Sequence, residues 1–196
     1  MPDDESNYII LEPKKVTMSS FVLNPFLLAV KDAQGNSNVM VVSYVGVASE
    51  VPPIITLAIR PSRYSHGLIS QKKDFTLNFP SLKMLPVIDF CGTFSGRKID
   101  KAAKLNLKFK EAEVVDAQFV LSSPLIMECR LQSLVELSKT EGATHDLFIA
   151  KVVNCLIISE FNIEAYNPVV TTNYTYRLVG EEIGKAHNYW HKKTGG

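Results

Sequence analysis

The sequence predicts a mainly β protein whose strands form a closed or partly open antiparallel barrel with a few short helices inserted. Apolar runs rich in β-branched and aromatic residues recur along the chain and are bounded by turn residues. Strands at this spacing, with small helices between them, are typical of a barrel. The chain has 196 residues, of which 46% are hydrophobic, so it can bury one sizeable core.

The first two strands are expected to form a hairpin. The run 21–31 is interrupted at Asn24-Pro25, and the polar stretch 32–37 that follows contains Gly35, which suits the positive φ of a turn. The next run, 39–47, has a largely continuous apolar character, which predicts one strand covered on both faces. Two strands around so short a turn pair antiparallel.

A third strand, a helix and a fourth strand are expected next. Residues 54–59 form another apolar run, whereas 64–73 have a helical pattern with Leu68 and Ile69 on one face. Residues 75–79 alternate apolar and polar side chains, which places the apolar ones on one side of a strand.

The second half of the chain is expected to hold two long strands. These are residues 125–137 and 147–158, and the polar segment 138–146 joins them as a hairpin. Before them, residues 81–106 look like short helices around a glycine-containing loop. After them, 169–179 form a last β-prone stretch.

Composition limits the classes of function. We expect one domain, residues 1–196, with its core at about 20–180 and a frayed, flexible tail at 191–196. The formal net charge of +1 provides no general attraction for nucleic acid or an anionic membrane. No apolar run approaches the roughly 18 residues of a membrane span, and the chain starts acidic where a signal peptide is basic. These features predict a cytoplasmic protein.

No catalytic or metal-binding role is expected for the cysteines or for three of the histidines. Cys91, Cys129 and Cys155 are expected to be reduced and buried as small apolar side chains. No metal site is expected, because His, Cys and acidic residues do not recur at metal-ligand spacing. The histidines expected at the surface are His66, His187 and His191.

Two basic clusters stand out in this neutral chain. Arg60 and Arg63 lie directly after a predicted strand, at the start of the predicted helix. The second cluster, 95–101, has Lys101 one turn into another helix. A helix N-terminus presents unpaired N–H groups, and flanking arginines and hydroxyls complete an anion site. Each cluster alone also fits an ordinary solvated helix start capped by a serine.

Several motifs follow one another in a fixed order along residues 20–180. They are NVMVVSYVG at 38–46, Pro52-Pro53, RPSRYS at 60–65, FTLN at 75–78, CGTFSGR at 91–97, Asp100-Lys101, Ser123-Pro124, Glu128-Cys129, HDLFI at 145–149 and Arg177-Leu178. Each motif alone is unspecific. The ordered set resembles the flavin reductase-like, FMN-binding split-barrel family, which includes flavoredoxin.

The resemblance implies a Greek-key split barrel, a homodimer, and a non-covalent FMN near the subunit boundary. The residues that would run along the isoalloxazine are Asn38, Val39, Met40, Val41, Ser43 and Tyr44. The residues that would meet the ribityl phosphate are Arg60, Ser62, Tyr64 and Ser65 from one side and Ser95, Arg97 and Lys101 from the other. The two basic clusters thus converge on one expected anion site.

His145 is the candidate catalytic residue on the nicotinamide side. Related flavin reductases carry a histidine near the nicotinamide at this place, usually preceded by Gly-Asp, whereas here Ala143 and Thr144 precede it. A neutral imidazole there could hydrogen-bond the flavin or the pyridine carboxamide. The alternative is an ordinary polar residue at the end of a hairpin.

The leading functional hypothesis is an FMN-dependent oxidoreductase, namely an NAD(P)H-dependent flavin reductase. In that reaction the protein acts by positioning the donor against the flavin, and no side-chain nucleophile is required. The alternative is a flavoredoxin-type electron carrier that exchanges electrons with a redox protein and has no nicotinamide site, which the incomplete motif before His145 favours slightly. A third possibility is a flavin-binding barrel without turnover.

Overall fold

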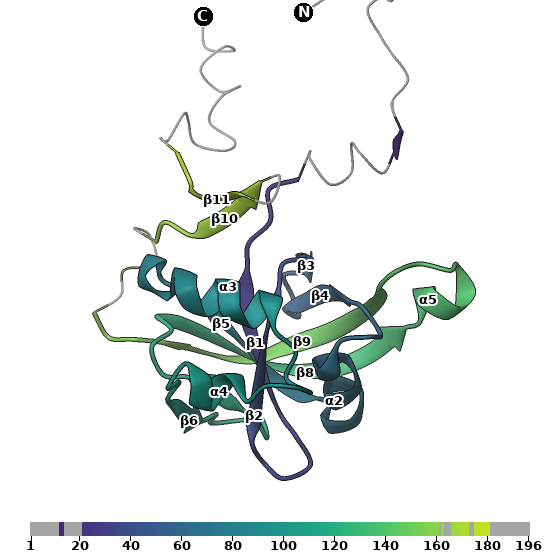
Figure 1. Cartoon of the computed structure of the whole chain (residues 1–196). Helices are drawn as coiled ribbons and strands as arrows, with labels where there is room; N and C mark the ends of the chain where they lie inside the picture. The colour runs from purple at the N-terminus through teal and green to yellow at the C-terminus, as the bar shows by residue number, and fades with distance from the viewer. Residues whose placement is uncertain (1–11, 14–20, 161, 163–165, 173–174, 181–196) are drawn as a thin grey trace, which may run out of the picture.

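The core of the molecule is one large antiparallel sheet. The structure is a computed structural model, which describes residues 12–13, 21–160, 162, 166–172 and 175–180. The seven strands of the sheet are β1 (Phe26–Lys31), β2 (Ser37–Val42), β3 (Val45–Ser49), β4 (Ile54–Ile59), β5 (Asp74–Phe79), β8 (Leu125–Val135) and β9 (Asp146–Ile157). Their spatial order is β2-β1-β5-β8-β9-β4-β3 (Figure 1). The predicted mainly β class, a split barrel with short helices, is confirmed.

The link between β2 and β3 joins the two edges of the sheet. These strands lie at opposite ends of the spatial order, yet only Ser43 and Tyr44 separate them along the chain. Just past β2, the N–H of Ala58 in β4 donates to the Tyr44 carbonyl oxygen at 2.9 Å. The sheet therefore curls so that its edges approach each other, as in a barrel.

The expectation of a single strand over residues 39–47 was wrong. The apolar run contains the bend at Ser43-Tyr44, because hydrophobicity reports burial and not strand direction. Its second part is also more exposed than expected, with Val47 77% exposed in β3. The predicted hairpin of β1 and β2 is confirmed, with Phe26 opposite Val42.

Strand β1 is buried on both faces and separates two layers of core. Leu28 packs into the main cluster inside the barrel, while Leu27 and Ala29 pack into a second cluster. Strand β5 is also buried on both faces. Its apolar side chains lie on one side, as predicted. On the other side, the Asn78 amide donates to the Leu27 carbonyl at 2.9 Å and accepts from the Val120 N–H at 2.8 Å.

All but one of the short helices lie where the sequence predicts them. The helices are α2 (Tyr64–Lys72), the 3-10 turn η2 (Leu82–Met84), α3 (Leu85–Thr93), α4 (Lys101–Lys104) and α5 (Leu137–Thr140). The exception is the last, α5, which begins the segment that was expected only to connect two long strands. Helix α3 packs against β1 and β2, α4 against β2, and α2 against β1, β2, β5 and β8. Helices from two separate parts of the chain thus meet at β2 (Figure 1). None of the described helices is long and apolar enough to cross a membrane.

The prediction missed one short hairpin. Strands β6 (Phe109–Glu111) and β7 (Gln118–Val120) pair with each other and have three residues each, too few to show a periodic pattern. The expected β-prone stretch 169–179 forms two paired strands, β10 (Val169–Thr172) and β11 (Thr175–Leu178). The long pair β8–β9 is confirmed as a hairpin. The expected tail at 191–196, with His187 and His191, lies outside the described residues.

All three cysteines are free thiols, and two of them are buried as predicted. Cys155 is exposed, so the expectation that it is buried was wrong. It lies in the last part of β9, beyond Val152, where the regular alternation of buried side chains ends.

Candidate functional site

Lys101 is a buried cation at the centre of the site. It begins α4, whose N-cap Asp100 accepts a hydrogen bond from the Ala103 N–H at 2.9 Å. The residue is 5% exposed, and its Nζ donates to the Cys91 carbonyl oxygen at 3.3 Å. Burial lowers the pKa of the Lys101 ammonium, and the charge of Arg63 lowers it further. In the described part of the chain Lys101 has no acidic partner, so a bound anion would supply the missing charge.

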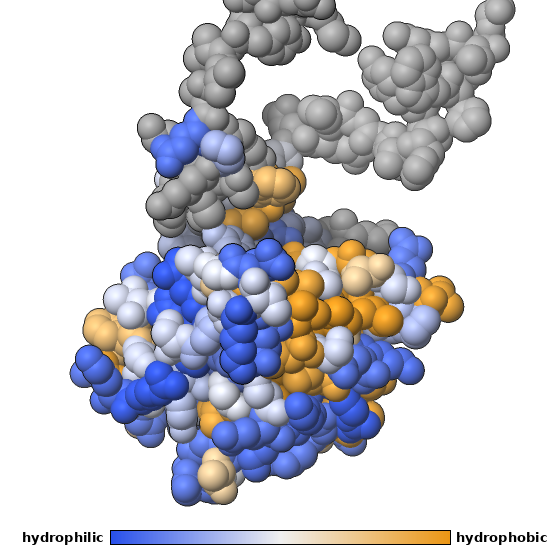
Figure 2. Space-filling view, turned by 90° about the vertical axis from the view of Figure 1, so that its right-hand side faces the viewer, coloured by the Kyte–Doolittle hydropathy of each residue, from blue (hydrophilic) through white to orange (hydrophobic). Residues whose placement is uncertain are grey.

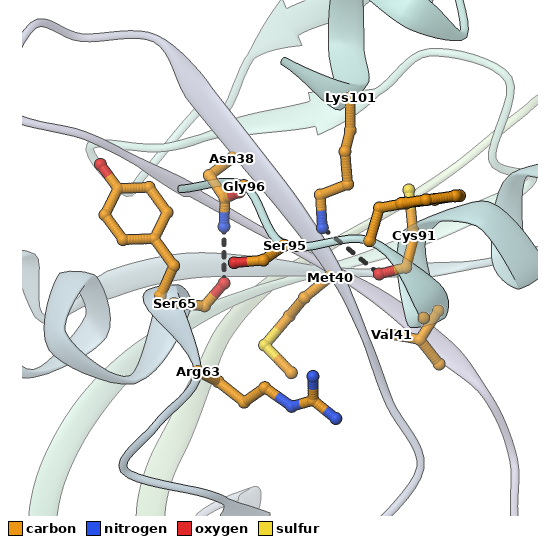
Figure 3. A pocket seen from close by; sticks show the side chains of 12 residues that line it. Asn38, Met40, Val41, Arg63, Ser65, Cys91, Ser95, Gly96 and Lys101 are labelled. Carbon is orange, nitrogen blue, oxygen red and sulfur yellow. Dashed lines mark hydrogen bonds between the residues drawn. The ribbon is translucent and has the colours of Figure 1, made fainter. Parts of the chain in front are cut away.

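The start of α2 faces the same hollow. Arg63 is the N-cap, no side chain caps this terminus, and no acidic residue lies in the first turn. The uncapped N–H groups and the helix dipole favour an anion here. Ser65, which is 1% exposed, accepts a hydrogen bond from Asn38 Nδ2 at 2.6 Å. Figure 3 shows the side chains of Lys101, Ser65 and Arg63 around this hollow.

Gly96 allows the loop after α3 to approach β2. A Cβ at this position would collide with the side-chain oxygen of Asn38 and come within 3.2 Å of Tyr64 Cδ1. Only glycine therefore fits between these two side chains. The loop is also tied to the start of α2, because Arg97 Nη1 donates to the Ser62 carbonyl oxygen at 2.9 Å.

Arg97 connects further parts of this surface. Its guanidinium carbon lies 5.6 Å from the centre of the Tyr64 ring, within the range of a cation–π interaction. Its own N–H donates to Ser95 Oγ at 3.3 Å. The segments around Ser62 and Ser95, which are far apart in the sequence, thus form one surface, as the two basic clusters suggested.

Two hollows adjoin here. The smaller, of about 50 Å³, lies between α2, β2 and the loop after α3, and the larger, of about 580 Å³, extends along the start of β2. The larger volume is within the roughly 300–1,000 Å³ typical of small-molecule sites. Both hollows share Asn38, Tyr64, Gly96 and Lys101.

The expected flavin-facing stretch of β2 is only partly turned toward these hollows. Met40 and Val41 line the smaller one, and Asn38 lines both. Val39 borders the larger one but is 1% exposed and packs into the second core cluster. Ser43 and Tyr44 lie outside the lining, at the bend between β2 and β3.

A second group of predicted residues meets beside the hollows. Arg60 Nε donates to His145 Nε2 at 3.4 Å, and the Tyr44 ring centre lies 5.1 Å from that of His145. The structure thus places Arg60 at His145 and outside the lining of both hollows. Burial lowers the pKa of His145, and the charges of Arg60 and Arg63 lower it further.

Sequence reasoning missed several lining residues. Arg63 was noticed as part of a basic cluster, but only the structure places it in the lining of the smaller hollow. The other lining residues absent from the expected set are Cys91, Gly92, Phe94 and Gly96. The SGR motif was a signal for Gly96, whereas nothing local in the sequence distinguishes Phe94.

His66 was expected at the surface, and this expectation was wrong. Its side chain is 13% exposed, and Nε2 lies 2.9 Å from Asp146 Oδ2. The imidazole also packs edge-on to the Phe148 ring at 4.9 Å. The partner residue is distant in sequence, so spacing could not reveal this pair. Among the described residues, no three His, Cys or acidic side chains gather as metal ligands would.

The fold and this site define a split β-barrel with a basic pocket beside β2. The chain belongs to the family described as flavin reductase like domain, whose model matches residues 18–179. This confirms the resemblance. An uncharacterized protein of Archaeoglobus fulgidus is 30% identical over 117 residues, which are 60% of this chain. The chain spans 63% of the length of that relative.

Solved structures share the fold. Flavoredoxin of Desulfovibrio vulgaris (Miyazaki F) is 24% identical with a TM-score of 0.80, covering 92% of this chain and 100% of its own. An FMN-binding protein from Thermus thermophilus is 19% identical with a TM-score of 0.76, covering 91% of this chain and 98% of its own. At these identities the likeness concerns the fold alone.

Proposed function

We propose that this protein binds FMN and acts as an NAD(P)H-dependent flavin reductase. The observation that carries the proposal is the buried Lys101 ammonium, which lines a hollow without an acidic partner among the described residues. A phosphate monoester is the anion that membership of this family suggests. A cytoplasmic location stays a prediction.

The residues present fit the phosphate end of FMN. Lys101 and Arg63 would supply charge, Ser65 and Ser95 hydroxyl groups, and the start of α2 its N–H groups. The ring would extend along β2, past Met40 and Val41 and toward Tyr44. Gly96 keeps the loop close enough to β2 to narrow the hollow.

Bound FMN would supply the redox chemistry by accepting a hydride from a nicotinamide and passing electrons on. The chain's own residues would bind the flavin, orient the nicotinamide against it and exclude water from the site. His145 stays unprotonated near neutral pH because its pKa is lowered by burial and by the two arginines. A neutral imidazole can hydrogen-bond a polar edge of either ring system without adding charge.

The visible spectrum of the purified protein tests FMN binding. The protein should be yellow or take up added FMN, and Lys101→Met should weaken binding roughly 10- to 100-fold, since a charge-assisted hydrogen bond contributes about 1.5–3 kcal/mol. Lys104→Met, on the same short helix but outside both hollows, is the matched control and should bind normally. A colourless protein that ignores FMN would rule the proposal out.

Anaerobic mixing of the FMN-loaded protein with NADH and with NADPH tests the reductase activity. Rapid loss of the flavin absorbance is required of a reductase. The second candidate is an electron carrier that receives its electrons from a redox protein. It is favoured by Thr144, because this residue takes the place of the Asp in the reductase motif. Thr144 hydrogen-bonds His145 Nδ1 at 2.8 Å. A carrier would retain its absorbance with both nucleotides and lose it with dithionite.

We also propose that the protein is a homodimer with the flavin site near the subunit boundary. An apolar groove of about 470 Å³ lies between β3, β4, β8 and β9. Figure 2 faces the side on which these strands lie in Figure 1, and it shows a continuous hydrophobic area there. A second copy of this chain would remove that area from water.

A further inference from the structure

A tight turn holds Arg60 and Arg63 together at the edge of the site. The Arg63 N–H donates to the Arg60 carbonyl oxygen at 2.9 Å, and Pro61 occupies the second position of this turn. A turn of this kind keeps its first and fourth Cα atoms within about 7 Å of each other. Two guanidinium groups therefore start from neighbouring points of the backbone.

His145 orients the first of these arginines. Arg60 Nε donates to His145 Nε2, which must be unprotonated to accept, so the ring proton is on Nδ1 and points to Thr144 Oγ1 at 2.8 Å. A guanidinium has five N–H donors. Nε is the only one that the structure engages with a described residue, which leaves the four terminal N–H groups of the exposed Arg60 side chain for another acceptor.

The charge of this cluster is not balanced within the described residues. Neither Arg60 nor Arg63 forms an ion pair with any of them. Asp146 follows His145 in the chain, but its carboxylate is 2% exposed and already accepts from His66 and from the Ser138 N–H at 2.9 Å each. It is therefore turned into the protein and does not neutralise the arginines from the solvent side.

The cluster adjoins the flavin pocket. Arg63 lines the smaller hollow, and the turn ties it to Arg60, which contacts His145, so the cluster begins at the edge of that hollow. The Tyr44 ring packs beside His145, at the end of the stretch along which the flavin ring would lie. An anion held by Arg60 would be bound next to the flavin and not in the phosphate hollow of Lys101.

We propose that Arg60, oriented by His145, forms a second anion site that binds a phosphate or carboxylate group of the compound exchanging electrons with the flavin. The proposal rests on the proposed function, because it assigns the partner of the same flavin. It also gives Arg60 a different role from the FMN-phosphate contact that the family resemblance suggested.

Two pairs of probes identify the anion, with the FMN-loaded protein titrated by flavin absorbance. NADP⁺ against NAD⁺ measures the value of an added phosphate, and benzoate against benzamide measures the value of a carboxylate. In at least one pair, we expect the compound that carries the additional anionic group (NADP⁺ or benzoate) to bind roughly tenfold or more tightly than its counterpart. The pair that shows the preference identifies the phosphate or the carboxylate as the recognised group.

Arg60→Gln should abolish this preference and leave FMN affinity within about twofold. Lys151→Gln, which removes an exposed cation from β9, is the control and should keep the preference. Equal binding within both pairs, or a preference that survives Arg60→Gln, would overturn the second anion site while leaving FMN binding intact. A large loss of FMN affinity in Arg60→Gln would return Arg60 to the FMN phosphate, and a protein that takes up no FMN would overturn both proposals.

Discussion

Gly96 occupies a position that has no room for a side chain. Gly96→Ala would push a methyl group into the Asn38 amide, which hydrogen-bonds Ser65. We expect at least about fivefold weaker FMN binding, because losing a hydrogen bond and its geometry costs about 1 kcal/mol or more. Fluorescence titration of FMN measures the loss.

The matched control for this substitution is Gly67→Ala, since nothing lies within 4 Å of a Cβ built at that position. It adds the same methyl group inside α2 and should leave FMN affinity unchanged while stabilising the helix by roughly 0.5–1 kcal/mol. Equal FMN affinity in the two variants would show that the Gly96 contact does not shape the site.

The protonation of His145 provides a prediction in pH. Burial first, then Arg60 and Arg63, hold its pKa below the ordinary value, so the imidazolium forms only at lower pH than in a free histidine. Arg60→Gln removes one positive charge, which makes protonation easier and should raise the pKa. It should remain below the ordinary value, since burial and Arg63 persist.

An NMR titration of the His145 ring protons measures this shift, with His145→Gln to assign the signal. Lys151→Gln, an exposed charge change elsewhere, should leave the curve in place. A pKa that does not move in Arg60→Gln would mean that Arg60 and His145 are not in contact in solution.

At the scale of residues, the sequence revealed where positive charges cluster along the chain but not which surroundings each side chain contacts. Lys101 and Ser65 were expected near a phosphate, and the structure places both in the lining of one hollow. Arg60 and Arg63, three residues apart, point to different surroundings, which no linear pattern could separate. His66 was misjudged because its partner, Asp146, is on another element.

Among the elements, β8 fixes the loop before β7 through one side chain. Glu128 is fully buried, and its carboxylate accepts from the N–H groups of Glu113 and Val114 at 2.8 and 2.7 Å. Glu128→Ala would leave both donors without their partner, and each such loss costs about 1–3 kcal/mol. We expect the free energy of unfolding to fall by roughly 2–5 kcal/mol in urea denaturation.

Glu113→Ala is the control for this measurement. It keeps the backbone N–H that Glu128 binds and removes only an exposed side chain, whose ion pair with Lys110 at 3.6 Å is worth at most about 1 kcal/mol. If both variants unfold at the same urea concentration, Glu128 does not hold the loop.

Long elements were predictable and short or bent ones were not. The pair β8–β9 has enough residues for its apolar pattern to define it, and α2 was expected within one residue of its end. The three-residue strands β6 and β7 depend on tertiary contacts such as that from Asn78 to Val120. The bend at Ser43-Tyr44 follows from closure of the sheet, in which β2 and β3 lie at opposite edges. This closure depends on strands far along the chain, so the local sequence pattern could not predict the bend.

For the whole molecule, the exposed apolar groove gives a prediction about assembly. Val47 borders it, and a charge there would prevent a second copy from covering it. We expect the protein to sediment as a dimer and Val47→Glu to sediment as a monomer. Leu121→Glu, at a 52% exposed leucine outside the groove, should remain dimeric. A monomeric unmodified protein would contradict the assembly.

The short link between β2 and β3 also constrains how the chain acquires its shape. Strand β2 can pair with β1 as soon as both are synthesised, because they are neighbours in sequence. Strand β3 pairs with β4, whose other neighbour is β9, far later in the chain. The sheet can therefore close only after most of the polypeptide has left the ribosome, and until then β4 presents an open edge to other chains.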